Sequence, residues 1–413
     1  MSFAANLSAS SFPRSGVSRQ DAQRLLAKRK SRQPKRPFVL PHWIPSFAGM
    51  MALFIGLLSF SGCSKEPLYQ EQGYVFGTLV EVSVYGADEV KAKQAVSLVM
   101  QEFQRLHDML HAWKPSELSE LNTAIAQGKS KVVPKELADM LQQAAQISAQ
   151  SEGTFNPSIG DLIQAWGFQA DDFKAVLPDA KKIAALVKAN PQLSDLKFSN
   201  LNPSQPPLIR GGVYGSLPDK GGPGWVWVSS NNPALKLDLG GYAKGYALDR
   251  AAAILKLQGI HNALINIGGN VLALGTHGKR PWKVGIQHPR KPGALATLEL
   301  QDGEAIGTSG DYQRYFELDG KRYCHLIDPR TGQPVQGVQA VTILTHGKQA
   351  GVLSDAASKP LFISGESGWR SVAHKMQLEE ALLIDAQGVV HLTAAMQKRL
   401  EFTDNKTVQS IEP

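Results

Sequence analysis

Cysteine is scarce in this sequence, which has only Cys63 and Cys324 among its 413 residues. The chain therefore has no CxxC pair, and it has no GxxxxGK[ST] segment either. These absences argue against a dithiol redox motif and against a nucleotide site of the P-loop type. If Cys63 is lipidated, no partner remains for a disulfide, and the fold must depend on its apolar core.

Acidic residues are nearly absent from the first 62 residues, which hold nine lysines and arginines and a single acid, Asp21. This segment accounts for the whole formal net charge of +8, because the remaining chain carries 35 basic and 35 acidic residues. A nucleic-acid-binding domain concentrates basic residues on its folded part. The balanced charge beyond residue 62 therefore argues against nucleic acid as a partner.

Long apolar runs are missing as well. The segment "FAGMMALFIGLLSFSGC" is too short for a comfortable transmembrane helix, but it has the length of a secretory signal core and follows the basic segment. Its end, "FSGC", resembles the lipobox of bacterial lipoproteins, in which the cysteine becomes the lipidated N-terminus. We therefore predict lipidation of Cys63 and an anchor in the inner membrane, on its periplasmic side. An uncleaved signal anchor is the alternative.

Regular elements are predicted by the apolar periodicity. The alternating valines of "GYVFGTLVEVSVYG" predict a half-buried strand, and helical spacing predicts helices over about 87–111 and within "VVPKELADMLQQAAQISAQSEG". After about residue 225, strand-like segments dominate, and Asp319 with Gly320 is typical of a hairpin turn. Helices and strands come in blocks and not as repeated βαβ units. This order predicts an α+β fold.

The predicted organisation has one large domain with short flanking parts. The insertion is rich in proline and glycine without periodicity, so it lacks the apolar surface needed to order itself. The parts are a basic leader with a lipoprotein signal (1–62), a linker (63–72), the main domain (73–400) with a flexible insertion (199–224), and a tail (401–413).

Four glycine-rich junctions stand out: "EGTFNPSIGDLIQAWGF", "LDLGGYAKGYALD", "NIGGN" and "GTSGDYQRYF". Glycine lets backbone N–H groups approach a ligand closely and bind an anion, although any single junction is also compatible with a simple tight turn. His107 and His111 form a further possible metal pair at i,i+4 spacing. They lie beside an apolar helical stripe without a third ligand in view, so a structural role is the stronger interpretation.

With "HLIDPRTGQPV" and an isolated Asp355, these junctions resemble, in order across about residues 73–395, the FAD:protein FMN transferase family, ApbE. The resemblance implies an α+β fold related to the T-fold, with a mostly antiparallel sheet and flanking helices. It also implies bound FAD, a Mg²⁺ ion and transfer of FMN from FAD to a Ser or Thr hydroxyl, with release of AMP. The implied acceptors are subunits of membrane redox complexes and soluble flavoproteins.

The resemblance also assigns roles to individual positions. It implies FAD contacts from Phe76, Trp113, Thr154, Phe155, Asn156, Asp238, Lys244 and Ile327. It places the metal on the carbonyl of Gly241 and the carboxylate of Asp355, with Ser358 and Lys359 at positions that often supply further oxygens. Asn156 stands where Asp is frequent, and Lys359 is a departure because a protonated ammonium has no lone pair for a metal.

The segment "LSDAASKP" therefore leaves a question open. Asp355 and Lys359 have the i,i+4 spacing of an ordinary surface ion pair on a helix over 350–363. Within a metal site, Mg²⁺ could bind through Asp355, Gly241 and phosphate oxygens with Lys359 turned aside, which is our expectation. Alternatively, the ammonium could take over part of the charge neutralisation that the metal provides.

His325 is the natural general base for the acceptor hydroxyl, because its ordinary pKa is about 6.5. A strand histidine bonded to the backbone is an equally good interpretation. Asp328 is better explained as the cap of the "DPRTG" turn. Two other functions stay open: an FAD-binding or storage protein without transfer activity, which Lys359 and Asn156 favour, and a protein with only an interaction role.

The apolar run and "SGC" generate a test of the anchor. Cys63→Ala should abolish labelling by a radioactive fatty acid and leave unprocessed precursor or a released form. Equal labelling of the wild type and the variant would contradict lipidation at Cys63.

Overall fold

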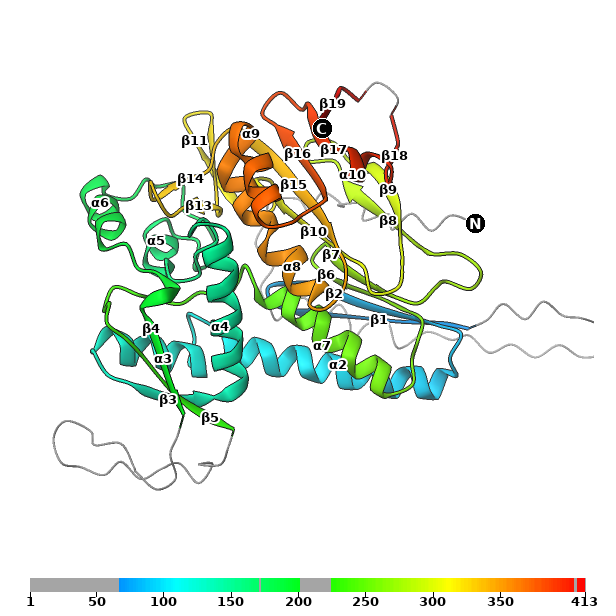
Figure 1. Ribbon diagram of the computed structural model, residues 1–413, viewed down its shortest axis with the longest axis horizontal. Coiled ribbons are helices and arrows are strands. Elements are labelled where there is room, and N and C mark those ends of the chain that lie inside the picture. The colour runs from blue at the N-terminus through cyan, green and yellow to red at the C-terminus, as the bar shows by residue number, and fades with distance from the viewer. Residues whose placement is uncertain (1–66, 171, 201–223, 405–406, 413) are drawn as a thin grey trace, which may run out of the picture. The chain divides into compact units, whose positions relative to one another are not determined.

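A nine-stranded sheet forms the centre of the fold in the computed structural model, which describes residues 67–412 except 171, 201–223 and 405–406 (Figure 1). In spatial order its strands are Leu68–Val75 (β1), Thr78–Tyr85 (β2), Ala263–Ile267 (β6), Asn270–Leu274 (β7), Ala305–Gly310 (β10), Val338–Thr345 (β15), Glu380–Asp385 (β16), Val390–Thr393 (β17) and Gln409–Glu412 (β19). All neighbours are antiparallel except β17 and β19, which are parallel. The predicted α+β class with a mostly antiparallel sheet is thus confirmed.

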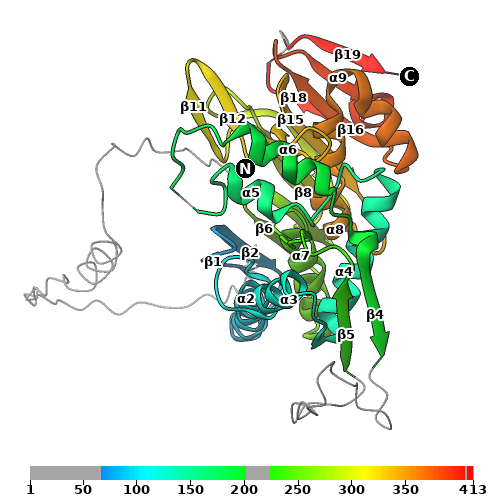
Figure 2. The ribbon, with the colours of Figure 1, turned by 90° about the vertical axis from the view of Figure 1, so that its left-hand side faces the viewer.

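Smaller sheets flank the large one. Two have three strands and two are hairpins, and Figure 2 shows β4 and β5 side by side. Their strands are Lys131–Pro134 (β3), Leu196–Asn200 (β4), Trp225–Ser230 (β5), Trp282–Gln287 (β8), Ala294–Leu300 (β9), Glu401–Phe402 (β18), Tyr315–Leu318 (β11), Lys321–Cys324 (β12), Ile327–Asp328 (β13) and Gln333–Pro334 (β14).

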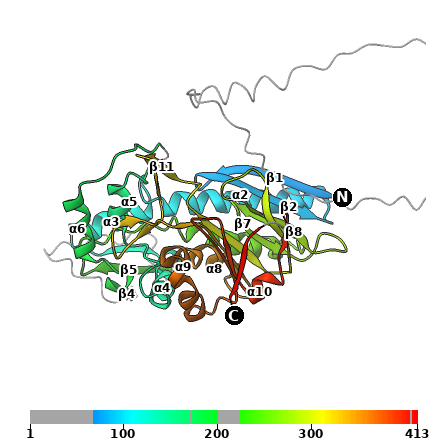
Figure 3. The same cartoon turned by 90° about the horizontal axis from the view of Figure 1, so that it is seen from above.

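Helices cover the sheet and connect its strands. Helices α8 and α9 pack over β10, β15 and β16, where Figure 3 shows them one after the other. The helices are Glu89–Leu110 (α2), Glu117–Ala126 (α3), Lys135–Gln150 (α4), Gly160–Ala165 (α5), Ala180–Ala189 (α6), Ala243–Leu257 (α7), Ala350–Ala356 (α8), Ser358–Lys375 (α9, interrupted at Gly365) and Ala394–Gln397 (α10), with a 3-10 turn at Leu193–Asp195 (η2). None of the helices in this described part is long and apolar enough to cross a membrane.

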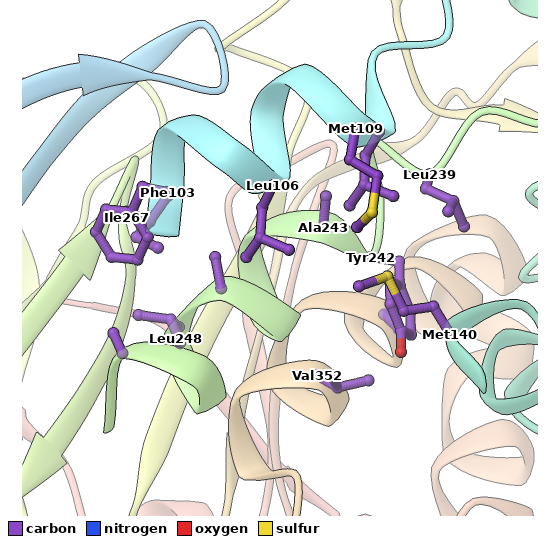
Figure 4. Close-up of a cluster of buried hydrophobic side chains, with 14 of the residues drawn as sticks. Phe103, Leu106, Met109, Met140, Leu239, Tyr242, Ala243, Leu248, Ile267 and Val352 are labelled. Carbon is purple, nitrogen blue, oxygen red and sulfur yellow. The ribbon is translucent and has the colours of Figure 1, made fainter. Parts of the chain in front are cut away.

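Helix α2 illustrates how the sequence produces these elements. Asp88 accepts hydrogen bonds from the N–H groups of Val90 and Lys91 and so starts the helix. Its apolar stripe is then buried against α7 and the sheet, as Figure 4 shows for Phe103 and Leu106. Burial of each such side chain contributes about 1.5–3 kcal/mol, so this cluster anchors the helices that carry the site.

Helices α7 and α8 approach one another at two glycines. A Cβ atom at Gly245 would overlap the carbonyl oxygen of Gly351, and one at Gly351 would approach that of Gly245. Each helix also supplies a carboxylate to the first turn of the other. Asp355 of α8 accepts from the N–H of Gly245 at 3.0 Å, and Asp249 of α7 accepts from the N–H groups of Gly351 and Val352, both at 2.9 Å. The two helices therefore cap each other reciprocally.

Most predicted elements are confirmed. The valine strand is β2, the two long helices are α2 and α4, and Asp319 and Gly320 have φ angles of 50° and 73°, as a type I′ hairpin turn requires. The predicted helix over 350–363 is present but is divided at Ala357 into α8 and α9.

Strands and their hydrogen bonds extend into the segments that the sequence assigned to the linker, the tail and the edges of the insertion. The supposed linker includes the start of β1, and the supposed tail contains β18 and β19, which pair with β9 and β17. The insertion begins later than predicted, because Ser199 and Asn200 pair with β5, and it ends before Gly224, whose carbonyl accepts from Lys135. Residues 201–223 and the predicted leader with Cys63 lie outside the described residues.

The close contact of α7 with α8 generates a stability prediction. Gly245→Ala should lower the free energy of unfolding by about 1–3 kcal/mol, because the added methyl overlaps the backbone of α8. Urea denaturation followed by circular dichroism measures the loss. Gly224→Ala is the matched control, since a Cβ there meets no atom within 4 Å. Equal stability of the two variants would show that α7 and α8 do not need this approach.

Candidate functional site

Two of the glycine-rich junctions lie side by side. The N–H of Asp238 donates to the carbonyl of Pro157 at 2.8 Å, and the N–H of Gly160 donates to the carbonyl of Lys236 at the same distance. These bonds join "EGTFNPSIG" to "LDLGGYAKG", although about eighty residues separate them in the sequence. The two junctions thus form one loop cluster at the start of α7. Residues from both could therefore contact the same ligand.

Asn122 of α3 fixes this loop cluster, and the sequence analysis did not identify it. Its side chain donates to the carbonyl of Leu237 at 2.9 Å and accepts from the N–H of the same residue at 2.7 Å. The buried amide thus bonds to both the N–H and the carbonyl of Leu237, as the backbone of a neighbouring strand would. Asn122 is therefore a positioning residue for the adjacent Asp238.

Asp238 and Trp113 are brought together as predicted. The indole Nε1 donates to Asp238 Oδ2 at 3.1 Å, while the N–H of Gly240 donates to Oδ1 at 2.8 Å. The ammonium of Lys236 lies over the Trp113 ring, 4.7 Å from its centroid. Trp113 is thus held between α3 and the loop with one ring face in contact with a cation.

A second group of predicted residues meets at the junction of α7, α8 and α9. The ammonium nitrogen of Lys359 lies 2.7 Å from both Asp355 Oδ1 and the Asp355 carbonyl oxygen. The aliphatic part of Lys359 covers Gly241, because a Cβ atom on Gly241 would lie 2.8 Å from Lys359 Cε. Lys359 is therefore not turned aside in this structure, and its orientation beside bound Mg²⁺ stays a prediction.

This ion pair is buried and not superficial. Asp355 is 1% exposed, and the side chain of Lys359 is 15% exposed. Burial alone would raise the pKa of Asp355, but the nearby ammonium groups of Lys359 and Lys244 and the N–H of Gly245 lower it to about 2. Asp355 is therefore ionised throughout the physiological range.

Lys244 in the first turn of α7 adds a second cation. Its positive charge acts on Asp355, Lys359 and His325, so its ammonium lies close to all three. Within the described residues, the ammonium group of Lys244 has neither a hydrogen bond nor an ion pair. A free cation beside a glycine-rich loop is suited to an anionic ligand such as a diphosphate.

His325 faces the same group of charges. Its Nδ1 lies 3.1 Å from the carbonyl oxygen of Arg314, which fixes the proton on Nδ1 and leaves Nε2 as an acceptor. Burial, followed by the positive charges of Arg314 and Lys244, lowers the pKa of His325 to about 3. The imidazole is therefore neutral at physiological pH, but the same shift makes it a weaker base, and its backbone hydrogen bond also matches the structural alternative.

The remaining predicted residues have mainly structural contacts. The Thr154 hydroxyl donates to the carbonyl of Ser151 at 2.6 Å, and Phe155 is buried. Asn156 accepts from the N–H and the hydroxyl of Ser158 and donates to the carbonyl of Pro191. The side chain of Asn156 therefore stabilises its own turn, and its predicted contact with FAD stays a prediction.

Two predicted FAD contacts lie in apolar surroundings. Phe76, with a φ angle of 55°, forms the turn between β1 and β2, and its ring packs edge-on against Phe103 and His107 of α2. Ile327 is 3% exposed and belongs to a cluster with Trp166. The contacts of both residues with FAD stay predictions.

The alternative histidine pair is structural. The His107 and His111 rings lie edge to face, and Nδ1 of His111 accepts hydrogen bonds from the N–H groups of Trp113 and Lys114. His111 is therefore the C-terminal cap residue of α2, and its side chain stabilises the turn that follows the helix. Asp328 likewise accepts from the N–H of Arg330, as the cap of its turn should.

The residues assigned to Mg²⁺ do not fit that ion. Both Asp355 oxygens have donors, from Lys359 and from the N–H of Gly245, and the Ser358 hydroxyl bonds to Ser309 Oγ and to the Asp355 carbonyl. Mg²⁺ requires oxygen ligands in near-octahedral geometry, whereas an ammonium already occupies the space beside Asp355 and Gly241. In the part of the chain that the structure describes, the one cluster of three potential metal-binding side chains lies elsewhere, at Glu366, Asp385 and His391.

Comparisons with known proteins identify the family of this chain. The sequence model described as the ApbE family matches residues 76–383. An FAD:protein FMN transferase of Rhodobacter capsulatus is 38% identical over 360 residues, which cover 86% of this chain and 64% of that protein, so the chain spans slightly less than two thirds of it. A protein of the same name from Klebsiella pneumoniae (strain 342) is 33% identical over 267 residues, covering 64% of this chain and 69% of that one.

Solved structures give the same result. The apbe protein of Thermotoga maritima superposes with a TM-score of 0.68 at 27% identity, over 81% of this chain and 99% of that one. The flavinyl transferase ApbE of Pseudomonas stutzeri gives 0.65 at 25% identity, over 81% and 97%. The fold, the order of the motifs and these similarities together show that the chain belongs to the ApbE family.

Proposed function

We propose that this chain is an FAD:protein FMN transferase, which moves FMN from FAD to a Ser or Thr hydroxyl of an acceptor protein and releases AMP. The observation that carries the proposal is the convergence of Lys244, Lys359 and His325 beside the "LDLGG" loop, in a chain whose relatives bear this name. Cations for a diphosphate and an acceptor for a proton are the groups that this reaction needs.

The reaction exchanges one phosphorus–oxygen bond for another. The acceptor hydroxyl oxygen bonds to the phosphorus on the riboflavin side of FAD, while the bond from this phosphorus to the bridging oxygen breaks. The bridging oxygen leaves with AMP, and the hydroxyl proton is transferred to a base. Negative charge grows on the phosphate oxygens and on the leaving group, where fixed positive charges stabilise it.

Different side chains of this protein can stabilise the negative charge and accept the proton. Lys244 and Lys359 supply positive charge to the diphosphate, and the neutral Nε2 of His325 accepts the hydroxyl proton. Trp113, held by Asp238, offers an aromatic face for a ring of FAD. These roles extend the proposal to named residues.

The acceptors we propose are exported flavoproteins, including subunits of membrane redox complexes. The lipid on Cys63 would hold the enzyme at the inner membrane, on the periplasmic side, within reach of them. The basic leader, the apolar run and "SGC" support this location.

A second candidate function is FAD binding without transfer. It is favoured by Asn156, whose side chain is engaged in its own turn, and by Lys359 in place of an oxygen ligand. Such a protein would bind FAD in the same place but would release no AMP in the presence of an acceptor.

Comparison of cells with and without this chain separates the two functions. Exported proteins are examined for flavin fluorescence on denaturing gels and by intact mass. A protein that carries covalent FMN only when the chain is present is then purified without flavin and incubated with the full chain and FAD. Formation of AMP together with the FMN mass supports the transferase, whereas FAD binding without either product contradicts it.

Substitution of His325 tests the proposed base. His325→Ala should lower kcat by about 10²–10⁴-fold while changing FAD affinity little, because a base acts on the acceptor proton. His374→Ala, an exposed position on α9, is the control and should be silent. Equal losses of binding and rate in His325→Ala would assign the residue a structural role.

The same residue generates a prediction for the pH profile. Because the pKa of His325 is lowered to about 3, its imidazole stays neutral well below pH 6.5. The acid limb of kcat/KM due to this group should therefore lie well below pH 6.5 in the wild type. An acid limb centred near pH 6.5 that disappears in His325→Ala would contradict the buried environment of His325.

A further inference from the structure

We infer that Lys359 supplies the positive charge that a divalent metal would otherwise bring to the FAD diphosphate, so that this chain binds FAD and transfers FMN without a divalent cation. The inference rests on the proposed function and specifies its chemistry. It follows from the position of one ammonium group between Asp355 and Gly241.

The ammonium is fixed in this position by three contacts. It donates to Oδ1 and to the carbonyl oxygen of Asp355, both at 2.7 Å, and its carbon chain lies against Gly241. Gly241 has no side chain to push it away. A surface i,i+4 ion pair would leave both charges in water, but here Asp355 is 1% exposed.

A metal ion would have to displace this ammonium from a buried carboxylate. Asp355 is held by the first turn of α7 through the N–H of Gly245, so it cannot move toward another position without breaking the reciprocal cap. If a metal displaced Lys359, the ammonium would lose its carboxylate partner and would lie unpaired near a second cation, Lys244, which is unfavourable. The nearby Ser358 hydroxyl is likewise engaged by Ser309.

The same geometry leaves Lys359 able to bind a phosphate. An ammonium has three N–H donors, and two of these serve Asp355. The third is available to a diphosphate oxygen. Lys244, which has no hydrogen bond or ion pair in the described part of the chain, adds a second positive charge. Together with the ionised Asp355, the two lysines leave one net positive charge for the FAD diphosphate.

Lys359 acts on the bond exchange already described without entering it covalently. It stabilises the phosphate oxygens while the hydroxyl oxygen bonds to phosphorus and the bridging oxygen leaves with AMP. The proton of the hydroxyl passes to a base, and the lysine keeps its own. No oxidant, reductant or metal is required for this balance.

The test measures FAD affinity of the full chain by quenching of flavin fluorescence, first in EDTA and then with increasing Mg²⁺. Wild-type affinity should differ less than about twofold between the two conditions. FMN transfer to the acceptor identified above, measured by AMP release and acceptor mass, should proceed in EDTA at the rate seen with Mg²⁺.

Two variants at position 359 separate charge from structure. Lys359→Thr removes the ammonium and opens a place for an ion beside Asp355, so its FAD affinity should fall at least about tenfold in EDTA and recover with Mg²⁺. Lys359→Met keeps the bulk of the side chain but offers no oxygen, so its affinity should fall and not recover. Lys375→Thr, at an exposed lysine on the same helix, is the matched control.

The outcomes distinguish this inference from the proposed function. FAD binding and transfer by the wild type that vanish in EDTA and return with Mg²⁺ overturn the inference and keep the transferase. Absence of transfer with and without Mg²⁺, despite a validated acceptor, overturns the transferase itself. If Lys359→Thr does not fold, the EDTA measurement on the wild type still decides the question.

Discussion

The buried carboxylate of Asp355 links the packing of the fold to the candidate site. One of its oxygens accepts from the N–H of Gly245, at the start of α7, and the other pairs with Lys359 at the start of α9. Asp249 completes the arrangement from the opposite side by binding the first turn of α8. Since these bonds join three helices, the loop before α7 and the cations around it have one fixed geometry.

That geometry explains why positive charge is concentrated at this point. Helix α7 begins directly after the "LDLGG" loop, and the two glycines at its contact with α8 bring Lys359 against Gly241. Burying two lysines near each other is unfavourable unless anions compensate them. Asp355 compensates part of this charge, and the remainder favours an anionic ligand. Lys359 therefore has two roles: its ammonium pairs with the buried Asp355, and it contributes to the positive charge that favours an anionic ligand.

The sequence predicted what depends on local chemistry. The Asp319–Gly320 turn and the cap of the Asp328 turn involve neighbouring residues, so their spacing was sufficient. The pairing of Asp355 with Lys359 was predictable for the same reason, but its burial was not, because i,i+4 spacing does not show which elements cover a helix. The spacing therefore did not indicate that Lys359 would lie in a buried pair against Gly241.

Features formed between distant segments were not predictable from one sequence. Asn122 and Leu237 are 115 residues apart, and no local pattern indicates that they pair. The short strands β18 and β19 gain their order from β9 and β17 and not from a periodicity of their own, so the C-terminal residues resembled a tail. Family resemblance gave the candidate residues, while their contacts showed which of them carry charge and which stabilise turns.

The central claim is that Lys359 occupies the place of a metal ion at the FAD diphosphate. A crystal structure of the full chain with FAD and Mn²⁺, with anomalous data to locate manganese, tests it most directly. The account predicts that Lys359 Nζ lies within hydrogen-bond distance of both Asp355 and a diphosphate oxygen, with no anomalous peak between them. A manganese peak beside Asp355 and the carbonyl of Gly241, with the lysine displaced, would contradict it.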